Sequence, residues 1–293
     1  MIANPAGLAA APPWFLPALS FVTGAAIGSF LNVVILRVPA GESIVRPGSH
    51  CACGRPIAWR DNIPIVSWLV LRGRARCCGR AFSVRYPLVE ALTGLLFLFC
   101  ARAFEPPVMA CGWVLLGSLV AATFIDLDTL EIPDALTVGL AAAGVVLSCV
   151  VPALHGERSG FAALDMLRSG ADSVEGVLIG SAILLWIAFI GGAILRKDAL
   201  GLGDVKLVGA IGAFTGWHGA VFAIFGGAVA GTAGLVLAMG AARIRKKPAE
   251  GAARLGFGVK IPFGPMLAFA GAAYFLLLHA RVDAWFARFA DLF

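Results

Sequence analysis

Long apolar runs, separated by mostly short polar connections, dominate the pattern along this chain. Several runs approach or exceed about 18 residues, the length that crosses the hydrocarbon core of a bilayer as a helix. We predict eight spans, at residues 14–36, 87–104, 108–125, 135–154, 174–195, 205–217, 219–241 and 262–280. Open sheets cannot cross lipid because their edge backbone groups would stay unsatisfied, and a barrel would show alternation instead of solid apolar runs.

The predicted fold is therefore an all-α polytopic membrane protein with about eight transmembrane helices. A single long polar insert, residues 37–86, lies between the first and second spans. This divides the chain into an N-terminal transmembrane anchor at 1–36, the insert at 37–86 and a larger transmembrane domain at 87–293. We expect the first span to be retained as an anchor, because no basic segment precedes it as in a cleaved signal.

Composition supports a membrane protein and charge suggests its orientation. Hydrophobic residues make up 60% of the chain and charged residues only 14%, against about 25% in a typical soluble domain. Eighteen of the 23 Lys and Arg residues fall in three segments, at 37–86, 196–206 and 242–261. With eight spans these segments share one side with 126–134, and the positive-inside rule makes that side cytoplasmic. The net charge of +6 therefore reflects orientation in a lipid bilayer, and we expect no nucleic-acid partner.

Two acidic residues interrupt apolar sequence at the same predicted depth. Asp126 ends the third span in "LVAATFIDLDTLEIPD", and Asp204 begins the sixth in "GLGDVK". Two close carboxylates share a proton, so one can activate water while the other polarises a peptide carbonyl, as in aspartic proteases. An ion-coupling site in a transporter fits the pair equally well, and a helix N-cap at Asp204 is a purely structural alternative. Gly201 and Gly203 would let a substrate backbone approach Asp204 closely.

Three further charged residues are supporting candidates. Asp134 follows a proline and suits the first turn of the fourth span, where acids favour the helix dipole. Lys206 could favour ionisation of one acid of the pair, or could reach the membrane interface as a snorkelling lysine. Glu90 sits early in an apolar span, so it is a candidate for a structural or substrate-contact role, with Arg85 as a possible partner.

Four cysteines in the insert form a candidate metal site: Cys51, Cys53, Cys77 and Cys78. A cytoplasmic location disfavours disulfides, and a segment of this size commonly needs a metal to stabilise its small core. We predict structural zinc bound by the four thiolates. The spacings "CAC" and "CC" are shorter than the usual Cys-x-x-Cys, so His50 is an alternative ligand. The other three cysteines lie in or near spans and are expected to be ordinary apolar residues.

Several motifs together resemble the type IV prepilin peptidases, which belong to the GxGD class of intramembrane aspartyl proteases. The resemblance runs from about residue 24 to 271 and rests on "GSFLNVVILRVP", "WRDNIPIVSWLVLRGR", "RYPLVEALTGLLF", "FIDLDTLEIPD", "GLGDVK" and "IPFGPMLAFAG", in the family's order. It implies that Asp126 and Asp204 are the catalytic aspartates and that 87–293 is a transmembrane aspartyl peptidase domain. Lys206 falls in the family's GxGDxK pattern, whereas the contracted cysteine spacing departs from the family's.

The resemblance implies a function in the bacterial inner membrane. Such enzymes remove the short basic leader of type IV prepilins or type II secretion pseudopilins after a glycine, at the cytoplasmic face. Many then methylate the new N-terminus with S-adenosylmethionine. We expect the acidic segment 126–134 to attract the basic leader. The competing hypotheses are an ion-coupled transporter, which should show repeats and broken helices at midplane, and an assembly subunit organised around the insert.

Overall fold

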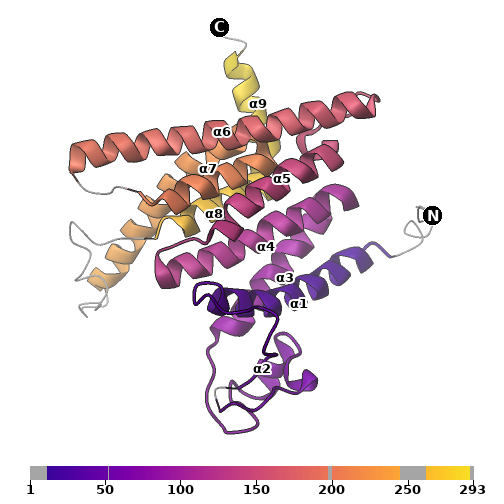
Figure 1. Ribbon diagram of the computed structural model, residues 1–293, viewed down its shortest axis with the longest axis vertical. Helices are drawn as coiled ribbons and strands as arrows, with labels where there is room; N and C mark the ends of the chain where they lie inside the picture. The colour runs from indigo at the N-terminus through magenta and orange to yellow at the C-terminus, as the bar shows by residue number, and fades with distance from the viewer. Residues whose placement is uncertain (1–11, 52, 197–199, 245–261, 291–293) are drawn as a thin grey trace. The chain divides into compact units, whose positions relative to one another are not determined.

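A computed structural model describes residues 12–51, 53–196, 200–244 and 262–290. These residues form helices and loops and contain no β-sheet (Figure 1). Within these residues, six helical segments are long and apolar enough to cross a membrane, the sixth being the continuous run Gly264–Arg288. The segment Asp134–Val150 adds a shorter apolar one. The predicted all-α polytopic fold is confirmed, whereas the predicted number of eight spans is not. Most basic residues of the predicted segment 242–261, together with Lys197, lie outside the described residues.

The chain forms two compact units that divide within α4, after Ala121. The helical elements of the first unit are α1 (Phe15–Arg37), η2 (Trp59–Asp61), α2 (Val66–Val70), α3 (Arg85–Ala103) and the first part of α4 (Pro106–Thr129). In this unit α1 packs along α3. Their backbones approach closely at Gly28, where a Cβ would lie 2.7 Å from the Cα of Glu90. Small residues permit such close packing between membrane helices. The Asn32 side chain also joins the two helices by donating from Nδ2 to the Tyr86 carbonyl at 3.2 Å.

The second unit continues with the end of α4 and the later helices. These are η3 (Asp134–Leu136), α5 (Val138–Val150), η4 (Pro152–His155), α6 (Ala162–Leu195), α7 (Leu202–Ile244), α8 (Gly264–Ala273), the π-helix η6 (Tyr274–Leu278) and α9 (His279–Ala290). α7 packs against α5, α6 and α8 and so forms the centre of this unit. Leu207, Val208, Ile211 and Phe214 on α7 are almost completely buried, and their side chains supply much of the core.

α7 is interrupted at Gly216, which has φ 68° and ψ −177° inside the helical run. A break in a helix leaves a carbonyl without its usual partner, which is costly at membrane depth. Two hydroxyls from neighbouring helices satisfy the Ala213 carbonyl: Ser173 Oγ donates to it at 2.7 Å and Ser148 Oγ at 3.3 Å. The break lies at the end of the predicted span 205–217, close to the start of the predicted span 219–241. The structure joins these two spans into one helical run with an internal interruption.

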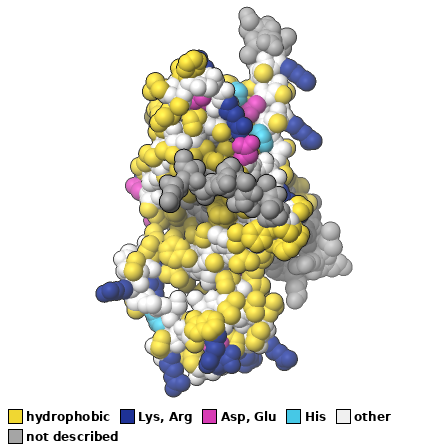
Figure 2. Space-filling view, turned by 90° about the vertical axis from the view of Figure 1, so that its right-hand side faces the viewer, with side chains coloured by type: hydrophobic (Ala, Val, Ile, Leu, Met, Phe, Trp, Pro, Cys, Tyr) yellow, Lys and Arg dark blue, Asp and Glu magenta, His cyan; other side chains and the backbone are white. Residues whose placement is uncertain are grey.

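The surface is rich in apolar side chains, as expected for helices that face lipid. Figure 2 shows broad hydrophobic areas, with Lys and Arg side chains confined to smaller patches. On α6, for example, Leu178, Trp186 and Phe189 each expose more than 60% of their surface. A soluble protein rarely exposes contiguous apolar surface on this scale. Together with the six helices of membrane-spanning length, this surface identifies a multi-pass membrane protein.

Candidate active site

Asp126 lies in the last turn of α4 and is only 4% exposed. The helix ends three residues later because Leu130 adopts a left-handed conformation, with φ 58°. The backbone N–H of Gly264, at the start of α8, donates to Asp126 Oδ2 at 3.0 Å. A Cβ at position 264 would lie 2.6 Å from that same oxygen, so only glycine fits without displacement. The carboxylate is thus fixed by a backbone donor that lies 138 positions away in the sequence.

Asp204 is the third residue of α7 and is 9% exposed. It is not the N-cap residue, since Gly201 directly precedes the helix. The Gly201 backbone hydrogen-bonds to the Asp204 carboxylate. Asp126 lies close enough to interact electrostatically with the same carboxylate. This arrangement resembles half of a capping box, in which an acid at the third helical position reaches back to the first free N–H. Two acids distant in sequence therefore meet at the ends of their helices.

Ile132 holds the two acidic helix ends together. It is 8% exposed and follows the turn that ends α4. A Cβ at Gly203, next to Asp204, would lie 3.4 Å from Ile132 Cβ, and a Cβ at Gly264 would lie 3.0 Å from Ile132 Cδ1. One apolar side chain therefore packs beside the backbone neighbours of both acids. Ile132 and Gly264 were not identified from the sequence, although the Gly-Pro pair that starts α8 is a recognisable helix-start signal.

Of the two glycines in "GLGDVK", Gly203 packs against Ile132, whereas Gly201 leaves space beside Asp204. Neither Gly201 nor Gly203 has a positive φ, so backbone strain does not require glycine at these positions. A Cβ at Gly201 would approach nothing closer than Asp204 Oδ2, at 3.6 Å. No other described residue therefore occupies the space directly beside Gly201 on this side of the carboxylate.

Lys206 and Asp134 form an ion pair next to this site, with 2.7 Å between Nζ and Oδ1. The pair links α7 to η3, whose first residue is Asp134. Both side chains are substantially exposed, at 41% and 69%, so the pair adds little to stability. Lys206 consequently neutralises part of the negative charge of the segment 126–134.

Glu90 lies in the first unit and connects α3 to the insert. It is 7% exposed, and its Oε2 accepts a hydrogen bond at 2.7 Å from the backbone N–H of Ile65. Ser29 on α1 also hydrogen-bonds to it. Ile65 has φ 63°, a conformation that a β-branched residue rarely adopts, and the bond from Glu90 helps to hold it. The structure therefore shows Glu90 in a bridging position between α1, α3 and the insert.

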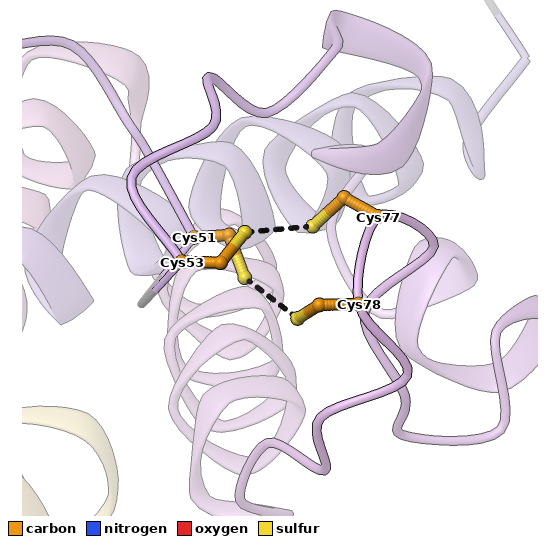
Figure 3. A group of neighbouring side chains, drawn as sticks. All are labelled: Cys51, Cys53, Cys77 and Cys78. Atoms are coloured by element: carbon orange, nitrogen blue, oxygen red, sulfur yellow. Dashed lines mark hydrogen bonds between the residues drawn. The ribbon is translucent and has the colours of Figure 1, made fainter.

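The four insert cysteines converge into one group, as Figure 3 shows. Cys51 Sγ lies 3.6 Å from Cys78 Sγ, and Cys53 Sγ lies 3.4 Å from Cys77 Sγ. All four sulfurs lie within 4.8 Å of one another. Tetrahedral coordination with a bond of about 2.3 Å places thiolates roughly 3.8 Å apart, so these residues can hold a metal ion such as zinc.

The cluster forms despite its short spacings because each pair lies on its own turn. His50 is not part of this group and its Nδ1 contacts the Gly48 carbonyl at 3.0 Å. Hydrogen bonding from the Cys53 backbone and from neighbouring thiols lowers the pKa of Cys51 to about 7.

Comparison with known proteins places the chain in a family. Residues 22–104 match the bacterial peptidase A24 N-terminal domain, and residues 113–236 match the type IV leader peptidase family. The prepilin leader peptidase/N-methyltransferase of Klebsiella pneumoniae is 38% identical, over 72% of this chain and 90% of its own. The type 4 prepilin-like proteins leader peptide-processing enzyme of Escherichia coli O78:H11 is 36% identical, over 89% of this chain and 94% of its own. This chain belongs to the type IV leader peptidase family.

The resemblance seen in the motifs is thereby confirmed. The prepilin leader peptidase/N-methyltransferase of Myxococcus xanthus is 41% identical over 75% of this chain, although the match spans only 64% of that relative. No solved structure matches the chain. The type IV leader peptidase match contains both Asp126 and Asp204, whereas the N-terminal domain match contains Glu90 and all four insert cysteines.

Proposed function

We propose that this protein is a membrane aspartic endopeptidase that removes the leader from type IV prepilins or type II secretion pseudopilins. The observation that carries the proposal is the pair of buried carboxylates, Asp126 and Asp204, each held by a backbone N–H at the start of a helix. The names of the related proteins supply the substrate class. Cleavage after a glycine and an inner-membrane location at the cytoplasmic face complete the proposal.

In this mechanism the two acids divide the roles of base and acid. Oδ2 of Asp126 accepts the Gly264 N–H, which favours placing a shared proton on Oδ1 of Asp126 or on Asp204. The ionised carboxyl removes a proton from water as it attacks the scissile carbonyl, and the protonated carboxyl donates to the carbonyl oxygen. The space beside Gly201 accommodates an extended substrate backbone next to Asp204.

The substrate's apolar helix lies in the bilayer in this proposal, while its basic leader meets the segment 126–134. Asp128 and Glu131 are exposed there, and Lys206 already neutralises part of Asp134. Charge reversal at Asp128 and Glu131 is expected to weaken processing and its dependence on salt. Processing that is unchanged by these reversals would exclude the segment as a leader-binding surface.

The family relationship gives no support to an ion-coupled transporter. α7 is broken, as transporter helices often are, but the break at Gly216 lies 12 residues beyond Asp204. That separation corresponds to roughly 18 Å along a helix, so the break is not at the acids. The deciding experiment is cleavage of a purified prepilin by Asp126→Asn and Asp204→Asn. Each variant should lose activity while keeping the wild-type melting temperature, and full activity in either would refute the assignment.

We also propose that the insert binds structural zinc through its four cysteines and that the protein methylates the new N-terminus. The convergence of the four sulfurs supports the first proposal. The names of the relatives support the second, for which S-adenosylmethionine would be the methyl donor. That donor supplies a methyl group to the amine released by cleavage, and the amine loses one proton.

A further inference from the structure

The insert carries an apolar surface that the proposed active site and the cysteine cluster leave unexplained. Its largest part is α2, where Val66, Leu69 and Val70 are 51%, 61% and 68% exposed. Trp59 in η2, which packs against α2, is 82% exposed. Apolar side chains that gather on a surface in this way mark an interaction site.

Hydrogen bonds fix the start of α2 at a level inside the ends of two spanning helices. The N–H of Ile65, which directly precedes α2, donates to Glu90 Oε2 at 2.7 Å. Glu90 lies five residues inside α3, about 7.5 Å from the start of that helix. Glu90 also hydrogen-bonds to Ser29, which lies eight residues, or about 12 Å, before the end of α1. The start of α2 is therefore level with the membrane-spanning parts of both helices.

The other end of α2 lies farther out. After Val70 the chain turns through Arg72 and Gly73, which have φ values of 51° and 68°. The Gly73 carbonyl accepts a hydrogen bond from the Phe82 N–H at 2.9 Å, and Phe82 lies three residues before α3 begins. Trp68 Nε1 donates to the Phe82 carbonyl at 3.3 Å and holds α2 to the same segment. α2 therefore runs outward, past the level at which α3 begins.

Basic residues follow α2 at this outer end. Arg72 and Arg74 are both exposed. The insert as a whole has nine arginines and only two acids, Glu42 and Asp61, and Asp61 is already paired with Arg76. Anionic lipid phosphates attract such an excess of positive charge. Apolar side chains on the deeper part of a helix and arginines at its outer end are typical of a helix that lies in a membrane interface.

We propose that α2 is such an interfacial helix, with its apolar side chains in the bilayer and with Arg72 and Arg74 bound to anionic phospholipid headgroups. Lipid is the partner because the start of α2 is level with two spanning helices, a depth that lipid surrounds. Trp59 suits the same position, since tryptophan is enriched at membrane interfaces. A second copy of the insert, or a basic prepilin leader, would be repelled by the arginines. The inference does not depend on the proposed peptidase activity.

Photocrosslinking to lipid tests the location of α2. p-Benzoylphenylalanine replaces Leu69 in the full-length protein, which is reconstituted in nanodiscs with equal amounts of phosphatidylglycerol and phosphatidylcholine. Irradiation should give lipid adducts at position 69, detected by mass spectrometry. Arg55 is the matched control position, because it is exposed on the turn that carries Cys51 and Cys53. The same probe at Arg55 should give no lipid adduct above background.

Several outcomes of this experiment would overturn the proposal. One is equal lipid labelling at positions 69 and 55. Another is adducts to a second copy of the chain, or adducts that form only when prepilin is added, because either would show that protein covers this surface. Val70 provides a second labelling position if the probe at Leu69 lowers the melting temperature, and the absence of lipid adducts at both positions would also refute the interfacial location.

The choice of lipid at position 69 tests the two arginines. Phosphatidylglycerol adducts should outnumber phosphatidylcholine adducts, and added salt should reduce this preference. A basic residue near a membrane surface contributes about fivefold to the attraction of anionic lipid, so Arg72→Gln and Arg74→Gln should each lower the ratio of adducts by up to about fivefold. Arg55→Gln is the control with the same change of charge and should leave the ratio unchanged. An unchanged ratio in the double variant of Arg72 and Arg74 would refute headgroup binding by these residues.

Discussion

Gly264→Ala is the sharpest perturbation of the proposed active site, because Gly264 contacts Asp126 through its backbone alone. An added Cβ would lie 2.6 Å from Asp126 Oδ2, whereas ordinary contact begins at 3.4 Å. Asp126 and the start of α8 must therefore separate by about 0.8 Å, which also lengthens the 3.0 Å hydrogen bond. Misplacement of a catalytic group by about 1 Å can cost roughly 100-fold in rate. We expect kcat/KM to fall about 100-fold, equivalent to about 2.7 kcal/mol.

The assay is cleavage of a purified prepilin in detergent, with kcat and KM determined separately. Most of the loss should appear in kcat, because the change misplaces a catalytic acid and removes no proposed substrate contact. Gly234→Ala is the matched control, since a Cβ at that position of α7 meets nothing within 4 Å. Cleavage by Gly264→Ala at the wild-type rate would show that the backbone bond to Asp126 is unnecessary and would refute this account of the site.

Three further predictions concern other parts of the molecule. Lys206→Met and Asp134→Asn should each change stability by less than about 1 kcal/mol, and the double variant should cleave no worse than either single variant, since the two residues act as one pair. Cys51→Ser should lower the zinc content of the purified protein, measured by mass spectrometry. After removal of metal, the rate of alkylation of Cys51 should rise with pH and reach half its maximum near pH 7, because the thiolate is the reactive form. Ser173→Ala should lower stability by about 1 kcal/mol in unfolding measurements, because the Ala213 carbonyl loses its shorter hydrogen bond. An unchanged zinc content, or an unchanged stability in Ser173→Ala, would contradict the corresponding assignment.

The sequence was sufficient to pair Asp126 with Asp204, because membrane topology limits where a residue can lie. A residue at the end of one span and a residue at the start of another share a depth if the intervening spans are counted correctly. The sequence also indicated the four insert cysteines as candidate metal ligands, because four thiols in one small cytoplasmic insert have few alternatives to metal binding. The sequence could not show that the four cysteine side chains converge despite their short spacings. That convergence depends on the separate turns that carry Cys51 and Cys77.

Backbone partners were beyond the reach of sequence reasoning. The sequence offered an arginine as one possible partner of Glu90, and the structure shows a bond to Glu90 from the Ile65 N–H. Every residue except proline has a backbone N–H, so residue type and spacing cannot show which backbone N–H bonds to a carboxylate. The bond from Gly264 to Asp126 was missed for the same reason, although the added Cβ contact explains why the donor residue is glycine.

The two acids of the proposed site have a common physical arrangement. Each carboxylate receives a backbone N–H from the start of a helix, Gly201 before α7 and Gly264 at the start of α8. Helix starts carry partial positive charge, so they reduce the cost of holding an acid at the edge of the hydrocarbon. A lysine or arginine at the same place would fix one carboxylate in an ion pair and occupy space next to it. Backbone donors from glycine support both acids and leave the surrounding volume for a substrate, which is why the positions of the glycines are as informative as those of the acids.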